Sequence, residues 1–144
     1  MSDNELRPIV VGVDGSAAGA AAFRWAAAEA RRWGCSLDAI SVWHMDYGVM
    51  TNPRAAASGL DPTSIEAENR SVLEAATADA EDADVRRILI EGDAKRLLVE
   101  MSRDARMLVV GNRGRGTVSE LLLGSVSAYC VHHATCPVVV VKTP

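Results

Sequence analysis

Residues Val109–Ser127 read VVGNRGRGTVSELLLGSVS, a stretch that joins an apolar run to a glycine-rich loop and then to the start of a helix. Gly111, Gly114 and Gly116 let the backbone turn sharply and approach a ligand closely, which leaves N–H groups free to point at phosphate oxygens. Gly124 and the residues after it present a helix N-terminus, which favours an anion. The stretch predicts a phosphate-binding loop, although the same glycines could simply shape a strand-to-helix connection.

The rest of the chain alternates short apolar runs with helical patterns. Residues 8–13 are apolar at nearly every position, as is typical of a strand buried on both faces of a parallel sheet. We predict strands over 8–13, 37–43, 85–90, 107–110 and 137–141, and helices that follow Ser16 and Asp61 and that cover 94–103 and 124–134. Strands alternating with helices predict a single α/β domain over residues 1–144, with a doubly wound open sheet of five parallel strands and helices on both faces.

Two of the predicted helices carry apolar residues at helical spacing. A Ser16 cap and the Gly34 stop bound the first helix, and Asp61-Pro62, with Glu66 three residues after Thr63, starts the second. The residues expected to face the core are Phe23, Ala26, Ala30 and Trp33 on the first helix and Ile65, Val72, Ala76 and Ala80 on the second. We interpret Trp25 and Trp33 as core or interface residues.

The position of a ligand cleft follows from the loops at the strand ends. In open α/β sheets, ligands bind beyond the carboxyl ends of the strands, where the strand order reverses. The loops richest in small and polar residues are DGS at 14–16 and GNRGRG at 111–116, so we place the first and fourth strands side by side. The segment 44–61 leaves the second strand at the same edge, and its length indicates a flap over the cleft or a disordered connection.

Composition narrows the classes of partner. The chain has 144 residues, 49% of them hydrophobic, and a formal net charge of −4 without a run of Lys or Arg. This balance argues against nucleic-acid or anionic-membrane partners, and no stretch approaches the roughly 18 apolar residues that cross a bilayer. We expect a cytoplasmic protein. Three cysteines without a framework spacing argue against structural disulfides.

Other ligand motifs fit less well. No Gly-Lys-Ser/Thr triplet occurs, and GVDGSA stands where a dinucleotide fingerprint would need G-x-G-x-x-G. A group of cysteines and histidines (Cys130, His132, His133, Cys136) could be counted as a zinc cluster, but its spacing matches no zinc pattern, and packing at a helix end explains it as well. We therefore predict no metal held by side chains.

Three segments together resemble the nucleotide-binding branch of the universal stress protein family. They are the pattern G-x2-G-x9-G-(S/T), met by Gly111, Gly114, Gly124 and Ser125, the segment VVGVDGS at 10–16 and the segment HHATCPVVVV at 132–141. The resemblance spans essentially the whole chain. It implies a Rossmann-like sheet with strand order 3-2-1-4-5, which agrees with the adjacency of the first and fourth strands, and it implies ATP in the cleft.

Carried over position by position, the resemblance implies a set of nucleotide-binding residues. Asp14 would bind the ribose hydroxyls, and the phosphates would be wrapped by 111–116 and 124–127, with Mg2+ held through the phosphates. Arg113 is not fixed by the motif, and its role as a counter-charge to phosphate is a physical inference. The full set is Gly12, Val13, Asp14, Val42, Gly111, Arg113, Gly114, Arg115, Gly116, Thr117, Gly124, Ser125, Val126 and Ser127.

These expectations favour a stress-response sensor or regulator over a fast enzyme. Rapid phosphoryl transfer needs a positioned nucleophile, metal-binding side chains and charge neutralisation, whereas the motif supplies a backbone cradle and one or two arginines. The alternatives are a slow ATPase or phosphotransferase, and a protein of the same fold that binds AMP or cyclic AMP. The strand order would leave Val138–Val141 at a sheet edge without charge, so we expect a homodimer through that strand.

Overall fold

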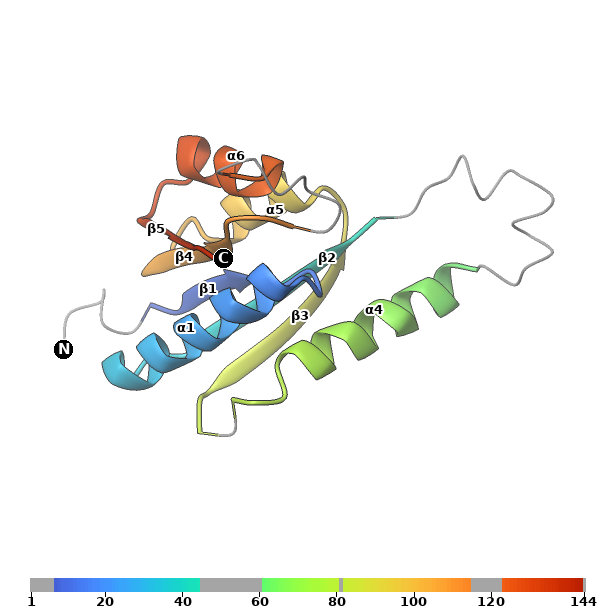
Figure 1. The fold of residues 1–144 in the computed structure, drawn as a ribbon, viewed down its shortest axis with the longest axis horizontal. Coiled ribbons are helices and arrows are strands. Elements are labelled where there is room, and N and C mark those ends of the chain that lie inside the picture. The colour runs from blue at the N-terminus through green and yellow to red at the C-terminus, as the bar shows by residue number, and fades with distance from the viewer. Residues whose placement is uncertain (1–6, 45–60, 81, 115–122, 144) are drawn as a thin grey trace.

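The computed structural model describes residues 7–44, 61–80, 82–114 and 123–143. Strands and helices alternate along these ranges, which confirms the predicted order of elements (Figure 1). The elements are β1 (Ile9–Gly12), α1 (Ala17–Trp33), β2 (Leu37–Trp43), α4 (Pro62–Ala76), β3 (Val85–Glu91), α5 (Ala94–Met101), β4 (Met107–Gly111), α6 (Ser125–His133) and β5 (Val138–Val141).

The five strands form one parallel sheet in the order β3-β2-β1-β4-β5. Ile9 at the start of β1 is in register with Leu37 of β2 on one side and with Met107 of β4 on the other. The chain leaves β1 towards β2 and later returns to the opposite side of β1 as β4. This reversal of strand order between β1 and β4 is the place where a Rossmann-like sheet opens a crevice for a ligand.

The core consists of two apolar layers, one on each face of the sheet. Alternate residues of β1 enter different layers, since Val11 packs in the layer that contains Phe23 of α1 and Leu73 of α4, and Val10 packs in the layer that contains Leu98 of α5. Ile9, Val10 and Val11 of β1 are at most 1% exposed because helices cover both faces of the sheet. The nearly continuous apolar run of β1 is therefore explained by burial on both faces.

Helix α1 lies very close to the end of β4. Its sheet-facing residues are mainly alanines, and Ala22 and Ala26 are fully buried. An added Cβ at Gly111 would stand 2.7 Å from the backbone carbonyl carbon of Ala18. A glycine at position 111 therefore serves the packing of α1 against the sheet.

Both ends of α1 are capped as the sequence predicts. The Ser16 side chain accepts a hydrogen bond from the N–H of Gly19, and Gly34 ends the helix in the left-handed conformation with a φ of 67°. Of the two alternatives predicted for the tryptophans, the core is excluded because Trp25 is 36% exposed and Trp33 is 48% exposed, and a place at an interface stays a prediction. Trp33 is the last residue of α1, and the Arg106 guanidinium group stacks on its ring, with 3.9 Å between Cζ and the ring centroid.

Helix α4 is shorter than predicted, and its buried residue is a different one. Asp61 caps it by accepting a hydrogen bond from the Ser64 N–H at 2.7 Å, which lowers the pKa of that carboxyl group. The helix ends at Ala76, so Ala80 is buried in the turn that follows rather than on the helix. Leu73 is fully buried, whereas Ile65, Val72 and Ala76 are only half-buried. The residues of α4 that pack in the core layer, Leu73 and Ala76, lie in the second half of the helix.

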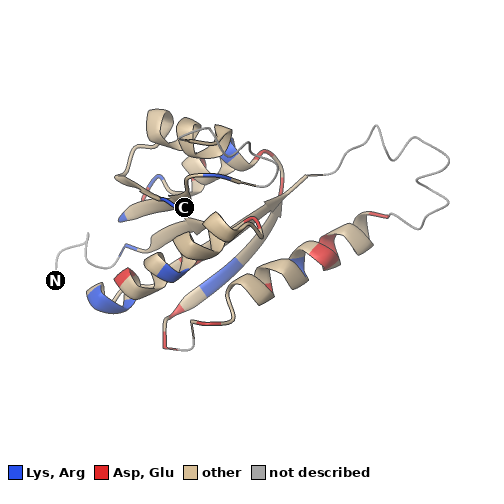
Figure 2. Cartoon of the chain, viewed as in Figure 1, with Lys and Arg blue, Asp and Glu red and all other residues tan. Residues whose placement is uncertain are grey.

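The two edge strands differ in chemistry. The basic band on β3 in Figure 2 consists of Arg86 and Arg87. Arg86 forms a bidentate ion pair with Asp38 on β2, with distances of 2.8 and 2.7 Å, and Arg87 donates hydrogen bonds to Thr77. Strand β5, at the other edge, contains four half-buried valines and no charge. Charged side chains protect the outer edge of β3 against pairing with another strand, and β5 lacks this protection.

Among the helices in the described part of the chain, none combines the length and the apolar character that crossing a membrane requires.

Candidate functional site

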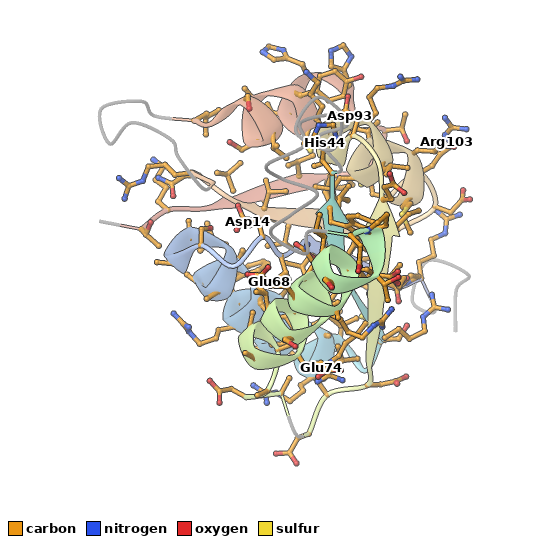
Figure 3. All side chains as sticks on the ribbon, turned by 90° about the vertical axis from the view of Figure 1, so that its right-hand side faces the viewer. Asp14, His44, Glu68, Glu74, Asp93 and Arg103 are labelled. Atoms are coloured by element: carbon orange, nitrogen blue, oxygen red, sulfur yellow. The ribbon has the colours of Figure 1, made fainter. Side chains whose placement is uncertain are left out.

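A cavity of about 230 Å³ opens at the carboxyl ends of the strands, at the point where the strand order reverses. Figure 3 looks onto this edge of the sheet, with Asp14, His44 and Asp93 on the side that faces the viewer. The volume is many times the roughly 10–15 Å³ that one water molecule needs. The cavity is lined by Gly12, Val13, Asp14, Gly19, Ile40, Val42, Ala94, Leu98, Val110, Gly111, Arg113, Gly114, Gly124, Ser125, Val126 and Ser127.

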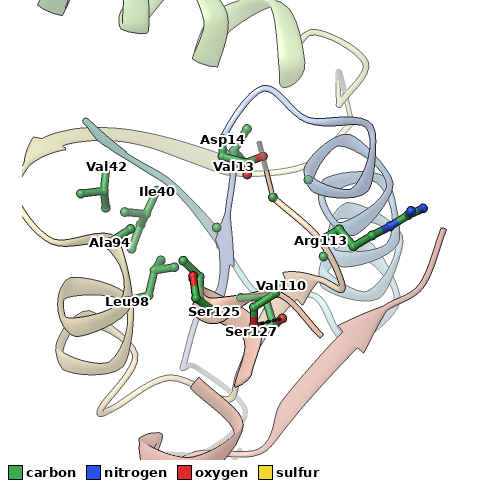
Figure 4. Close-up of a pocket in the computed structure, with 16 residues that line it drawn as sticks. Val13, Asp14, Ile40, Val42, Ala94, Leu98, Val110, Arg113, Ser125 and Ser127 are labelled. Carbon is green, nitrogen blue, oxygen red and sulfur yellow. Dashed lines mark hydrogen bonds between the residues drawn. The ribbon is translucent and has the colours of Figure 1, made fainter. Parts of the chain in front are cut away.

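One side of the cavity is apolar. Ile40 and Val42 project from β2, and Ala94 and Leu98 project from α5, so that the four side chains gather together in Figure 4. Leu98 comes close to β1 because Gly12 has no side chain: a Cβ atom added to Gly12 would lie 3.0 Å from the Leu98 Cδ1 atom. This side is an apolar surface against which the flat, uncharged ring of a ligand can pack, and it is formed before any ligand binds.

Asp14 supplies a carboxylate at the mouth of the cavity. It lies two residues after the end of β1, is exposed, and accepts hydrogen bonds on Oδ1 from the Ser16 backbone N–H, at 2.9 Å, and from the Ser16 hydroxyl. A Cβ atom added to Gly19 would stand 2.6 Å from Asp14 Oδ1, and one added to Gly114 would stand 2.9 Å from Asp14 Oδ2. The two glycines therefore leave the space that the carboxylate occupies, one from α1 and one from the loop after β4.

The loop after β4 and the start of α6 form the polar side of the cavity. The N–H groups in the first turn of an α-helix have no partner within the helix, and Gly124 at the cap of α6 supplies no side chain to satisfy them. Ser125 is exposed at this end. Ser127 is buried, and its hydroxyl donates towards the Gly124 carbonyl oxygen at 3.1 Å, so its hydrogen is already used within the protein.

Asn112 connects this polar side to two other parts of the chain. Its carbonyl oxygen accepts a hydrogen bond from the Gly124 N–H at 2.7 Å, and its N–H donates to the Val141 carbonyl oxygen at 3.0 Å. Its side-chain oxygen accepts hydrogen bonds from the N–H and the hydroxyl of Thr143. The 8% exposed Asn112 thus fixes the start of α6 and the chain beyond β5 relative to the end of β4.

Arg113 borders the cavity, but its guanidinium group points away from the apolar side chains and from Ser125 (Figure 4). Its Nη2 atom donates to the carbonyl oxygen and the hydroxyl of Thr143, at 3.3 and 3.4 Å. In this conformation Arg113 holds the C-terminal residues. A contact with phosphate would require the side chain to leave Thr143 and rotate into the cavity.

The sequence-predicted residues that the structure describes all border this one cavity. Arg115, Gly116 and Thr117 lie outside the described residues, as does the predicted flap except for its ends at His44 and Asp61. The lining residues that sequence reasoning did not assign to the site are Gly19, Ile40, Ala94, Leu98 and Val110. The one signal for Ala94 and Leu98 was the start of a helix directly after the third strand, at the same edge of the sheet.

The cysteines and histidines near α6 do not assemble into a metal site in the described residues, where no group of three potential ligands of this kind is found. His132 and His133 are exposed, and the His133 ring packs against Tyr129 at 4.2 Å. Cys130 is fully buried, and this burial, with a smaller effect of nearby Cys136, raises the pKa of its thiol to about 11. Cys130 is therefore a protonated core residue at neutral pH.

The fold and the cavity define a class of protein: a Rossmann-like α/β domain with a ligand site where strand order reverses, bordered by a glycine loop and a helix N-terminus. The family model of the universal stress proteins matches residues 5–142. The chain therefore belongs to the universal stress protein family.

Three relatives illustrate this similarity. A universal stress protein of Mycobacterium tuberculosis is 35% identical over 97% of this chain and 47% of its own length, so the chain spans about half the length of the curated relatives that it matches. A universal stress protein solved in complex with cAMP has a TM-score of 0.71 at 24% identity, covering 96% of this chain and 98% of its own. The protein from Archaeoglobus fulgidus in complex with dAMP has a TM-score of 0.58 at 23% identity, covering 94% and 98%.

Proposed function

We propose that the protein binds an adenine nucleotide, ATP, in the cavity at the end of β1 and β4 and acts as a stress-response sensor or regulator through that binding. The observation that carries the proposal is the meeting of three features in one cavity. These are an apolar side, a carboxylate at the mouth, and a polar side made of a glycine loop and a helix N-terminus. They suit, in turn, a base, a ribose and a phosphate chain.

The roles of the residues follow from this division. Adenine would lie against Ile40, Val42 and Leu98, and Asp14 would accept hydrogen bonds from the ribose hydroxyls. The phosphates would lie against the loop that starts at Gly111 and the first turn of α6, with Mg2+ held through the phosphate oxygens. Two structural neighbours bound to cAMP and dAMP support an adenine nucleotide as the class of ligand. Because one of these neighbours was solved with cAMP, an adenine nucleotide with a single phosphate is the second candidate ligand.

A regulatory role is favoured over rapid catalysis by the side chains in the cavity. Among the described lining residues, the ionisable side chains are those of Asp14 and Arg113, and the latter is turned towards Thr143. A carboxylate that binds ribose stands at the wrong end of the nucleotide to assist phosphoryl transfer, which depends on charge neutralisation at the γ-phosphate. Binding with at most slow hydrolysis is what this arrangement supports.

Replacing Asp14 with Ala tests the proposed function. We expect Asp14→Ala to weaken ATP and AMP alike, by about 10- to 100-fold, because both nucleotides lose hydrogen bonds from the same ribose to a charged acceptor. Binding of 2′,3′-dideoxy-ATP should change far less, since it lacks those hydroxyls. Isothermal titration calorimetry with the three nucleotides measures the effect.

The control for Asp14→Ala is Asp93→Ala, which removes a carboxylate from the same edge of the sheet but from a residue that does not line the cavity. Asp93 makes no side-chain capping hydrogen bond, so its loss should leave both the fold and ATP binding nearly unchanged. Equal losses for all three nucleotides in Asp14→Ala would assign Asp14 a different role, and failure of the wild-type protein to bind any adenine nucleotide would reject the proposed function.

We also propose that the protein forms a homodimer through β5. This strand pairs with β4 on one side, and its four valines are half-buried in the single chain. Antiparallel pairing of Val138–Val141 with its copy across a two-fold axis would satisfy the outer N–H and C=O groups and bury the valines. The opposite edge, β3, is less suited because Arg86 and Arg87 project from it.

Two substitutions in β5 test the dimer. Val139→Lys with Val140→Asp should give a monomer or insoluble protein, because the two side chains lie on opposite faces of the sheet and each charge would enter one of the apolar layers that the paired strand would help to cover. Sedimentation equilibrium at micromolar concentration should report a dimer for the wild-type protein. A wild-type monomer at that concentration would contradict the proposal.

A further inference from the structure

The segment Asp14–Gly19 contains a chain of hydrogen bonds that ends on the carboxylate at the cavity mouth. The N–H of Gly19 donates to the Ser16 Oγ atom at 3.0 Å, and the Ser16 hydroxyl donates to Asp14 Oδ1. The Ser16 N–H donates to the same oxygen at 2.9 Å. Because Gly19 occupies a lone pair of Oγ, the hydroxyl hydrogen of Ser16 is directed at Asp14.

This chain restrains a side chain that would otherwise be free to rotate. Asp14 is exposed, and a short exposed carboxylate loses rotational freedom when it binds a ligand. Two hydrogen bonds from Ser16 to one oxygen hold the carboxylate in one orientation before any ligand arrives, and both are of the stronger, charge-assisted kind. A carboxylate has about four acceptor sites, so acceptor capacity remains for a pair of ribose hydroxyls.

A second, independent feature agrees with this arrangement. Gly19 lies inside α1, where glycine is less favourable than alanine. An added Cβ at Gly19 would stand 2.6 Å from Asp14 Oδ1 and 3.2 Å from Ser16 Oγ. A glycine at this helical position therefore keeps open the space in which the hydrogen-bonded pair of Asp14 and Ser16 fits.

We infer that Ser16 is a positioning residue for ribose recognition: it orients the Asp14 carboxylate towards the 2′- and 3′-hydroxyls and so makes the site select ribonucleotides over dideoxynucleotides. The inference rests on the proposed function, because it assumes that Asp14 binds ribose. It goes beyond that function by assigning ribose selectivity to a residue that is absent from the cavity lining. Ser16 has an ordinary structural role as the cap of α1, and the test must separate the two roles.

The test compares ATP with 2′,3′-dideoxy-ATP by calorimetry in Ser16→Gly, Ser16→Thr and the wild-type protein. Glycine at the cap position preserves helix stability nearly as well as serine but has no hydroxyl, and threonine keeps both the cap and the hydroxyl. We expect Ser16→Gly to weaken ATP about three- to tenfold and to leave dideoxy-ATP unchanged, since only the ribonucleotide uses the oriented carboxylate. Ser16→Thr should retain the wild-type preference.

Gly19→Ala is the matched second variant, because it strengthens the helix while displacing the carboxylate. It should lose the preference for ATP without a fall in melting temperature. A wild-type ratio of the two affinities in Ser16→Gly would overturn the positioning role of Ser16, whatever the result for Gly19→Ala. A wild-type protein that binds both nucleotides equally would overturn the ribose role of Asp14 and the inference with it, and one that binds neither would overturn the proposed function.

Discussion

Gly114→Val should weaken ATP binding roughly 100-fold or more while leaving the fold close to that of the wild-type protein. The first atom of the new side chain would lie 2.9 Å from Asp14 Oδ2, so the valine must displace the carboxylate and fill the space beside it. Crowding of this kind and the loss of a charged hydrogen-bond acceptor together cost about 3 kcal/mol of binding energy, which corresponds to roughly two orders of magnitude in affinity. Calorimetric titration with ATP measures the change.

The fold should tolerate this substitution because the group that must move is an exposed carboxylate rather than the backbone. Gly114→Ala serves as the graded control and should have a smaller effect on ATP. The double variant with Asp14→Ala separates the two causes: a valine that acts only by displacing Asp14 should cost little more once that carboxylate is gone. Wild-type ATP affinity in Gly114→Val would exclude a role in ATP binding for the loop at Gly114 and for the carboxylate beside it.

Gly111→Ala should destabilise the protein by about 3 kcal/mol. It contrasts with Gly114→Val in the same motif, which should weaken ATP binding and leave the fold intact. Its Cβ would stand within 2.8 Å of three atoms of Ala18, two of them backbone atoms of α1, so either the helix or the end of β4 must shift. Inserting a methyl group into such a contact costs typically 1–3 kcal/mol, with rigid backbone at the upper end of that range. For a domain of this size, a fall in melting temperature of roughly 10 °C corresponds to such a loss.

Thermal or urea unfolding without nucleotide measures the effect, with Gly114→Ala as the matched control in which one methyl group meets only the end of the Asp14 side chain. Unfolding free energies that are equal in the two alanine variants would contradict the packing role of Gly111. A phosphate-contact role alone would instead leave stability in the absence of nucleotide unchanged, so this experiment distinguishes the two functions of a motif glycine.

Much of the fold could be predicted because local signals and burial agree. The apolar run of β1 indicates a strand covered on both faces, and Ser16 and Gly34 mark the ends of α1 by their capping chemistry. Trp33 was placed wrongly because helical spacing fixes only the direction of a side chain. It does not show what the side chain meets, and Trp33 packs on Arg106, the residue before β4.

The candidate site could be predicted in part. Residues that follow β1 and β4 were found because their loops carry glycine and aspartate in a recognisable pattern. Ala94 and Leu98 could not be found in this way, since an alanine and a leucine on a helix look like core residues until the sheet brings α5 alongside β2. The orientation of Arg113 depends on its contact with Thr143, a residue 30 positions away that no local pattern connects to it.

The hydrogen bonds of Asn112 have a practical consequence for any fusion to this protein. Because Thr143 is held by Asn112 and Arg113 next to the loop after β4, a tag or reporter attached at the C-terminus would leave the domain beside the cavity and pull on the residues that border it. Pro8, by contrast, precedes β1 at the amino end of the sheet, where its carbonyl oxygen accepts a hydrogen bond from Arg106. Fluorophores, affinity handles and surface-immobilisation groups for nucleotide titrations are therefore better attached ahead of Pro8, which lies at the end of the strands opposite the cavity.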